Sequence, residues 1–143
     1  SFGDTTISYD NYLRPIEFGI GKGTNYTKLK SLIWNNNKLQ QIVDEANNIT
    51  YSYTYDLISG QRTSKTVDNV TTNFYYSGDL LIYETDGTNY KKYIYDENNL
   101  LVELEAKYNN TKYNLIYERD ITGNIIGLID YNGNKVVKYL FGQ

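Results

Sequence analysis

The stretch Asn48–Asp56, with the sequence Asn-Ile-Thr-Tyr-Ser-Tyr-Thr-Tyr-Asp, decides the fold of this chain. Ile49, Tyr51, Tyr53 and Tyr55 alternate with small polar residues, so the four apolar side chains share one face of an extended backbone. β-Branched and aromatic residues suit a strand that is buried on one face. We therefore expect a β-strand here, ended by a turn at the closing Asp.

The same period of two recurs along the chain. It predicts further strands over Lys112–Arg119 and Lys135–Phe141, and no window of eleven residues shows a helical stripe. The expected fold class is all-β, built from tandem antiparallel β-hairpin repeats of about 20–25 residues that form a curved sheet or shell strip.

Turn signals separate the expected strands at short intervals. Asp86-Gly87 lies between Leu80–Thr85 and Thr88–Tyr95, and Asn132-Gly133 follows Ile125–Asp130. These two dipeptides tolerate the positive φ that two-residue hairpin turns require, so they are the strongest hairpin signals in the sequence. Weaker signals of the same kind are Asn47-Asn48, Asp68-Asn69 and Asn109-Asn110.

A residue pair that recurs about every 20–25 residues marks an internal repeat. Its first member is aromatic in six of seven cases, and its second member opens a turn. The pairs are Tyr9-Asp10, Trp34-Asn35, Tyr55-Asp56, Tyr76-Ser77, Tyr95-Asp96, Arg119-Asp120 and Phe141-Gly142. An apolar residue or Gly follows at Leu13, Leu39, Gly60, Leu80, Leu100 and Ile125. Each repeat is expected to be a strand, a hairpin tip, a second strand and a Tyr-Asp turn.

Both members of the pair have an expected physical role. A Tyr at the end of a strand lays its ring over the neighbouring hairpin and keeps its hydroxyl at a wet or hydrogen-bonded edge. The Asp accepts backbone N–H groups two residues further on, and a later Gly or Asn supplies left-handed backbone. The residues expected to form this structural signature are Tyr9, Asp10, Trp34, Asn35, Tyr55, Asp56, Gly60, Tyr76, Tyr95, Asp96, Arg119, Asp120, Gly123 and Tyr139.

No Pro- or Gly-rich linker interrupts the series, so we expect one continuous array over residues 1–143. Residues 18–23, which contain three Gly, are expected to be a looser insertion. A chain that starts with Ser and contains no Met is expected to be a piece of a longer protein.

At this point the sequence resembles a known family. The segments Tyr53–Thr63 and Tyr93–Asp96 are similar to the YD repeats of RHS proteins. The more specific likeness is Arg119–Asp130 followed by Asn132-Gly133-Asn134 and Tyr139, which is similar to the last repeats before the RHS-associated core. The resemblance covers residues 34–143 well and residues 1–33 weakly.

The resemblance implies a strip of a large β-sheet shell that encloses the C-terminal toxin domain of a secreted or surface-displayed polymorphic toxin. The implied partners are neighbouring repeats of the same shell and the enclosed toxin domain. Three pairs, at Trp34, Tyr76 and Phe141, lack the Asp, so their turns are expected to be held differently. The family's self-cleavage aspartates match nothing in this sequence, so autoproteolysis and toxin activity are not carried over.

Composition excludes several classes of function. The chain has no His and no Cys, so the common transition-metal sites and Ser/His or Cys/His nucleophile pairs cannot form within it. The net charge is −3 without a basic stripe, which argues against a nucleic-acid partner. The longest apolar runs, such as Leu80–Tyr83, are far too short for a membrane span. We expect no enzyme activity and no cofactor.

Two segments resemble ligand-binding loops but lack their defining residues, and one alternative function remains. Gly19–Thr24 lacks the spacing and the following helix of a phosphate-binding loop, and Asp96–Asn99 lacks the central Gly and distal Glu of a calcium loop. The alternative to a shell segment is a glycan- or cell-surface-binding repeat module, because 17 Tyr leave several rings exposed. Such a module needs no exposed sheet edge, whereas an isolated shell segment is expected to associate edge to edge.

Overall fold

The computed structural model of the protein describes residues 4–136, and these are all-β, as the sequence predicts. One 3-10 turn, η1 (Gly23–Asn25), is the single helical element among them. The strands are β1 (Thr5–Tyr9), β2 (Pro15–Ile20), β3 (Thr27–Asn35), β4 (Lys38–Asp44), β5 (Ile49–Tyr55), β6 (Arg62–Val67), β7 (Val70–Ser77), β8 (Leu80–Thr85), β9 (Tyr90–Tyr95), β10 (Leu101–Tyr108), β11 (Thr111–Arg119) and β12 (Ile125–Asp130).

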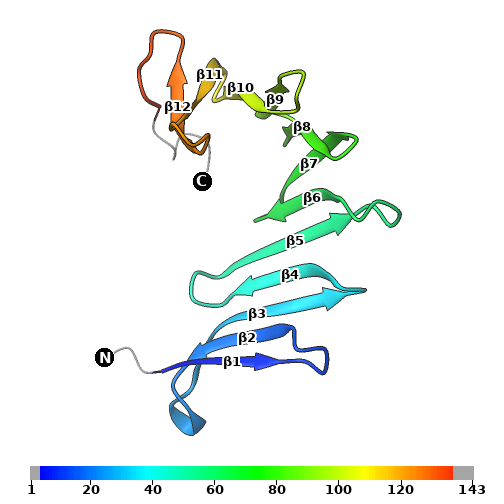
Figure 1. The fold of residues 1–143 in the computed structure, drawn as a ribbon. Coiled ribbons are helices and arrows are strands. Elements are labelled where there is room, and N and C mark those ends of the chain that lie inside the picture. Colours follow the sequence, from blue (N-terminus) through cyan, green and yellow to red (C-terminus); the bar gives the residue numbers. More distant parts are fainter. Residues whose placement is uncertain (1–3, 137–143) are drawn as a thin grey trace. The chain divides into compact units, whose positions relative to one another are not determined.

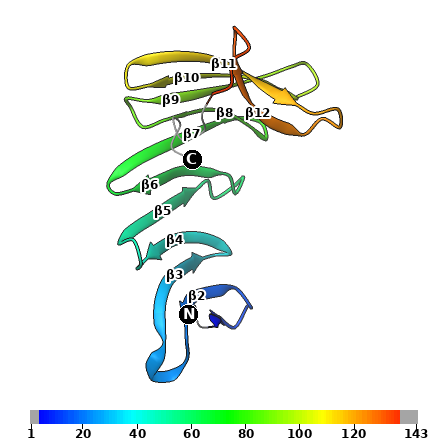
Figure 2. The ribbon, with the colours of Figure 1, turned by 90° about the vertical axis from the view of Figure 1, so that its left-hand side faces the viewer.

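The chain divides into two compact units, Ser1–Thr71 and Thr72–Gln143. Within each unit every strand pairs antiparallel with the next one in the sequence, so the strands lie side by side in chain order (Figures 1 and 2). The expected tandem antiparallel hairpins are therefore confirmed. No helix among residues 4–136 is long and apolar enough to cross a membrane.

Two-residue turns form at paired Asn or Asp residues. Asn36-Asn37, Asp68-Asn69 and Asn109-Asn110 connect consecutive strands, and all six residues have positive φ between 49° and 67°. This backbone has the right-handed twist that a tight hairpin needs, and Asn and Asp adopt it at modest cost. The signals rated weaker at Asp68 and Asn109 are thus the ones that make two-residue turns.

The hairpins predicted at Asp86-Gly87 and Asn132-Gly133 form, but their loops have four residues and not two. Residues 86–89 connect the antiparallel strands β8 and β9, and residues 131–134 connect β12 to Lys135, which bridges back to Ile129. The carboxylate of Asp86 accepts the backbone N–H groups of Thr88 and Asn89 at 2.9 and 2.7 Å. This side-chain bonding stabilises a longer loop, and the Gly supplies its positive φ.

Residues 18–20 are part of β2, so the prediction of a looser insertion over residues 18–23 is wrong for its first half. Gly19 is buried, and a Cβ atom there would lie 2.3 Å from the ring of Tyr26. The hydroxyl of Tyr26 donates to Glu17 at 2.7 Å, which holds the ring across β2. Gly19 is therefore required by the close approach of this ring, not by loop flexibility.

Very few described side chains are buried, because each sheet is exposed to solvent over much of its surface. Leu104, Ala106 and Leu115 in the second unit form the buried apolar core, with exposed fractions of 1–3%. They lie on one face of β10 and β11, and residues that pack against them include Tyr93, Tyr113, Tyr117, Leu128 and Val136. The first unit has a corresponding but more open aromatic face, with Tyr51, Tyr53, Leu32 and Ile42 around a shallow pocket of 270 Å³.

Candidate functional site

The repeat pairs gather at one edge of each unit. The odd-numbered strands end at Tyr9, Asn35, Tyr55, Ser77, Tyr95 and Arg119, at the first or second member of each pair. Alternate strands of an antiparallel sheet run in the same direction, so these strand ends lie on the same side of their unit, perpendicular to the outermost strands. We call this side, where the odd-numbered strands end, the repeat edge. In the first unit it carries the loops that follow β1, β3 and β5 (Figure 1).

At the repeat edge, Asp carboxylates hold the loops. Asp10 Oδ1 accepts the N–H groups of Tyr12 and Arg14 at 2.8 and 3.0 Å. Asp96 Oδ1 accepts those of Asn98 and Leu100 at 2.8 and 2.9 Å. These hydrogen bonds satisfy backbone N–H groups of the loop that have no partner in a neighbouring strand. The carboxylate therefore fixes the path of the loop.

Asp56 and Asp120 do the same in their loops. Asp56 Oδ1 accepts the N–H of Ser59 and of Ile58, and these bonds hold the pKa of the Asp56 carboxyl below its usual value. Asp120 Oδ1 accepts the hydroxyl of Thr122 and the N–H of Asn124, and the pKa of its carboxyl is lowered for the same reason. Hydrogen bonds to the ionised form favour that form.

The fourth residue of the five-residue loops has left-handed backbone. Leu13, Asn99 and Gly123 occupy this position with φ of 63°, 64° and 92°. Leu13 is 81% exposed, which shows that the position selects backbone geometry and not burial. Gly60 has φ of 76° in the longer loop after Asp56 and accepts no side chain without strain.

An equivalent loop follows Asp130, at the opposite edge of the second unit. Asp130 Oδ1 accepts the N–H groups of Asn132 and Asn134, each at 2.9 Å, and Gly133 has φ of 85°. Asp130 was not among the expected signature residues. The signal that identifies it is the pattern Asp-x-x-Gly-Asn, which Asp120–Asn124 also has.

The first member of four pairs links the two strands of its own repeat. Its side chain donates a hydrogen bond to a backbone carbonyl at the start of the strand before it. The four bonds run from Trp34 Nε1 to Pro15 at 2.8 Å, Tyr55 Oη to Leu39 at 2.7 Å, Tyr95 Oη to Leu81 at 2.7 Å and Arg119 Nη2 to Leu101 at 2.7 Å. Arg119, which stands where other repeats have an aromatic ring, also donates from Nη1 to Gly123 at 2.8 Å. Three residue types thus perform one function.

A β-bulge lies opposite the first member of every described pair. The strand that follows the pair carries one extra residue at this point, which the register between the two strands skips. The skipped residues are Ile16, Gln40, Thr63, Ile82, Val102 and Ile126. A bulge increases the local twist and re-aims a side chain. The residues paired with the first members are consequently Pro15, Leu39, Arg62, Leu81, Leu101 and Ile125, and only Leu39 and Ile125 are among the apolar positions that sequence spacing aligned.

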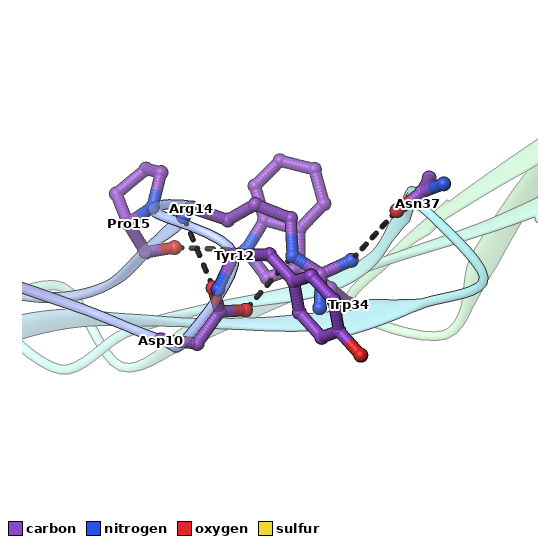
Figure 3. A network of polar contacts seen from close by, with 6 residues as sticks. All are labelled: Asp10, Tyr12, Arg14, Pro15, Trp34 and Asn37. Carbon is purple, nitrogen blue, oxygen red and sulfur yellow. Dashed lines mark hydrogen bonds and ion pairs between the residues drawn. The ribbon is translucent and has the colours of Figure 1, made fainter.

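Cations cover the aromatic rings at the repeat edge of the first unit. The guanidinium of Arg14 lies 5.1 Å from the ring centre of Tyr12 and 5.4 Å from that of Trp34, and it pairs with Asp10 at 2.8 Å (Figure 3). It also donates to Asn37 Oδ1 at 3.4 Å. This network joins two successive repeats through one side chain.

The next repeat has a similar arrangement. Lys38 Nζ lies 5.7 Å from the ring centre of Tyr55, and the guanidinium of Arg62 lies 4.2 Å from that of Tyr53. These cations cannot be recognised in the sequence, because a Lys or Arg at the start of a strand is an ordinary residue until the register shows which ring it covers.

Several expected signature residues differ from this pattern. Trp34-Asn35 is followed by the two-residue turn Asn36-Asn37 in place of an Asp loop, and Tyr76-Ser77 by a turn that begins at Gly78 with φ of 58°. These two pairs lack the Asp, so a turn with positive φ replaces its loop. Tyr139, like the pair Phe141-Gly142 and most of the expected strand Lys135–Phe141, lies outside the described residues.

The acidic side chains of residues 4–136 bond mainly to loop N–H groups and to Tyr hydroxyls. No group of three or more Asp and Glu residues there could hold a metal ion. The carboxylates of the repeat edge are occupied by N–H groups, and Tyr hydroxyls donate to Glu across neighbouring strands at Tyr90–Glu105 and Tyr93–Glu84 and from loops at Tyr26–Glu17 and Tyr131–Glu103. Burial, followed by the charge of Glu84, raises the pKa of Tyr93, and burial raises the pKa of Tyr117 to about 12.

Comparison with known proteins gives one curated relative. No family model matches the chain. The chain is 36% identical over 94 residues to the tRNA3(Ser)-specific nuclease WapA of Bacillus spizizenii. The match covers 63% of this chain and 4% of WapA, so the chain spans a small part of that protein.

Comparison with solved structures supports the fold. The crystal structures of TcdB2-TccC3-TEV and of TcdB2-TccC3 without its hypervariable C-terminal region each match with a TM-score of 0.62 and 16% identity. Each match covers 92% of this chain and 8% of the solved chain. The recurring pair, the tandem hairpins and these likenesses fit an RHS/YD-repeat protein, the family that the sequence resembles.

Proposed function

We propose that this chain is a non-catalytic structural segment of an RHS/YD-repeat β-shell that encloses the C-terminal toxin domain of a secreted or cell-surface protein. The observation that carries the proposal is the set of hydrogen bonds from Trp34, Tyr55, Tyr95 and Arg119 to the preceding strand. Each bond holds the two strands of one repeat together at the same place, so every repeat is a similar unit and a sheet of this kind grows by addition of repeats.

The faces of the strands in both units are largely uncovered, and this supports a segment of a wall rather than a self-contained module. Within residues 4–136 only Leu104, Ala106 and Leu115 are buried apolar side chains, and no helix covers either face. A sheet with an aromatic face needs another layer or an enclosed guest to cover it. The partners we propose are neighbouring repeats and that guest domain.

The small share of WapA that the chain matches supports a wall segment that is distinct from any catalytic domain. WapA is a nuclease by name, and the chain matches 4% of it. The described residues hold the repeat edge with carboxylates that already accept two or more bonds, so we assign them no catalytic role. In this proposal the pairs from Tyr9-Asp10 to Arg119-Asp120 are the structural signature of the wall.

The test measures protection of the guest. In the longer protein that carries this chain, the double variant Tyr55→Ala and Tyr95→Ala should expose the C-terminal domain to protease at a temperature where the parent protein protects it. Tyr75→Ala, at a ring that is 51% exposed, is the matched control and should leave protection unchanged. Equal protection in the double variant and the parent would contradict the proposal.

A glycan array on the same protein addresses the alternative function. Binding of a cell-wall glycan that Tyr75→Ala abolishes, with guest protection absent in the parent, would replace the shell segment by a glycan-binding module. The proposal expects no such binding.

A further inference from the structure

Three tyrosine rings form a continuous row across neighbouring strands of the second unit. Tyr75 in β7 lies opposite Tyr83 in β8, and their ring centres are 5.8 Å apart. The ring centre of Tyr83 is in turn 5.7 Å from that of Tyr90 in β9. These separations, with the ring planes tilted by 44° and 34°, are those of aromatic rings in contact. A ring in this row that loses an electron can therefore recover it from its neighbour.

The row ends at a carboxylate. The hydroxyl of Tyr90 donates to Glu105 Oε2 at 2.9 Å, and Lys112 Nζ lies 3.8 Å from the other oxygen, Glu105 Oε1. The hydrogen bond to Glu105 raises the pKa of Tyr90, so its phenol is protonated at neutral pH and must release a proton when it is oxidised. Glu105 is placed to accept that proton.

The strand register favours a bond between Tyr83 and Tyr90. They are diagonal neighbours, because the residue opposite Tyr83 is Lys92, two positions beyond Tyr90. Diagonal neighbours lie about 7–8 Å apart, against about 4.5–5.5 Å for directly opposite residues. A carbon–carbon bond between the ring positions next to the two hydroxyls holds the Cβ atoms well apart, so it suits the diagonal pair better than the opposite pair Tyr75–Tyr83. Tyr75, at 51% exposure, is the ring of the row that an external oxidant reaches most easily.

We propose that Tyr83 and Tyr90 are an oxidative cross-linking site, at which hydrogen peroxide and a haem peroxidase join β8 to β9 through a dityrosine bond, and that Tyr75 passes oxidation on to this pair. Each phenol of the pair gives one electron to the oxidant and loses its hydroxyl proton, and the proton of Tyr90 goes to Glu105. The two radicals then form a bond between the carbons ortho to the hydroxyls. The hydrogens on these carbons move to the oxygens and restore both phenols. Hydrogen peroxide takes up the two electrons and two protons and becomes two molecules of water.

The cross-link would give covalent strength to a chain that has no Cys and hence no disulfide. It lies on the face opposite the buried core, because Tyr90 is three residues from Tyr93 in β9 and Tyr93 packs against the core that contains Leu104. The inference concerns these side chains alone and does not depend on whether the chain encloses a guest.

The test treats the full chain with a haem peroxidase and hydrogen peroxide, at a dilution where molecules do not join one another. The product should show the blue fluorescence of dityrosine and a mass lower by two hydrogens. A protease that cuts after Glu separates Tyr83 from Tyr90 at Glu84, so mass spectrometry of the digest should find these two fragments joined. In urea, where the sheet is lost, the joined fragments should be spread over other tyrosine pairs.

Variants of the row separate the roles of its members. Tyr83→Phe and Tyr90→Phe should each abolish the cross-link, because Phe has no phenol to oxidise. Tyr75→Phe should slow cross-linking several-fold and leave its position unchanged. Glu105→Gln keeps the shape of the proton acceptor without its basicity, and it should slow cross-linking on the order of tenfold or more.

Tyr131→Phe is the matched control. Tyr131 is 62% exposed and its hydroxyl donates to Glu103 at 2.6 Å, but it forms no ring pair with another aromatic residue in the described part of the chain. Its loss should therefore leave the rate and the yield of the Tyr83–Tyr90 cross-link unchanged.

Two results in the parent chain would overturn the inference, whatever the stability of the variants. One is the absence of joined Tyr83 and Tyr90 fragments, and the other is joining that is equally frequent at other tyrosine pairs. Cross-linking of Glu105→Gln at the parent rate would contradict the assigned proton acceptor. Guest protection in the longer protein is a separate measurement, so failure here leaves the shell proposal standing.

Discussion

At the scale of single residues, the two members of the repeat pair have separate tasks. The Asp holds its own loop, as the two N–H groups on Asp56 Oδ1 show, and the preceding residue bonds to the strand before its own. This separation explains why either member can change alone. Trp34 keeps the bond to the preceding strand although Asn35 replaces the Asp, and Arg119 keeps it although the ring is gone.

Acid should weaken the loops that these carboxylates hold. The pKa values of Asp56 and Asp120 are lowered in the folded chain, so their contribution to stability is present above the unfolded pKa of about 4 and is lost as the pH falls further. We expect the urea midpoint to fall between pH 7 and pH 3. The variant Asp56→Asn with Asp120→Asn should start lower at pH 7 and lose less of its midpoint on acidification. An equal acid loss in variant and parent would show that these two carboxylates are not the titrating groups.

At the scale of strands, the sequence predicts the elements better than their pairing. Alternation gives β8 and β12 the bounds Leu80–Thr85 and Ile125–Asp130, and the structure has the same bounds. A one-face aromatic pattern is a property of the strand itself, so it is visible in the sequence.

The bulges could not be predicted, because they are properties of two strands together. Five of the six skipped residues are β-branched, but β-branched residues are also common at other strand positions, and the spacing of the skipped residue from the pair varies. The covering cations Arg14 and Lys38 were missed for the same reason. Asp68-Asn69 and Asn109-Asn110 are weaker turn signals in the sequence because Asp and Asn adopt positive φ at some cost, whereas in the structure the positive φ of both residues fits the twist of the flanking strands.

Removing one hydroxyl should measure the strength of the bond from a pair's first member to the preceding strand. Tyr95→Phe keeps the ring and deletes the donor to Leu81, so it should lower the free energy of unfolding by about 1 kcal/mol, the typical net value of one hydrogen bond. Tyr75→Phe is the matched control, because its hydroxyl has no hydrogen-bond partner within residues 4–136, and it should change stability by less than about 0.5 kcal/mol. Urea unfolding measures both. A cost for Tyr75→Phe as large as that for Tyr95→Phe would assign the effect to the ring surface.

At the scale of the whole molecule, the width of each unit limits what it can enclose. Strands lie about 4.8 Å apart, so six of them span about 24 Å between the first and the last. A guest domain of about 100 residues has a radius of gyration of about 13 Å and hence a diameter of about 34 Å. One unit is therefore narrower than such a guest, and a wall needs many more repeats than either unit supplies.

The open edge of β1 should make the isolated chain associate at high concentration. An edge strand without a partner offers unpaired N–H and C=O groups to another chain, and β1 also exposes Ile7 and Tyr9, by 41% and 54%. Sedimentation velocity over a wide concentration range should show a monomer that gives way to a dimer. Ile7→Lys places a charge on this edge strand and should keep the chain monomeric, because a buried like-charge contact between two copies is unfavourable. A parent chain that stays monomeric at millimolar concentration, with β1 amides as protected from exchange as those of the inner strand β3, would mean that the edge is already covered and that the chain is a self-contained module.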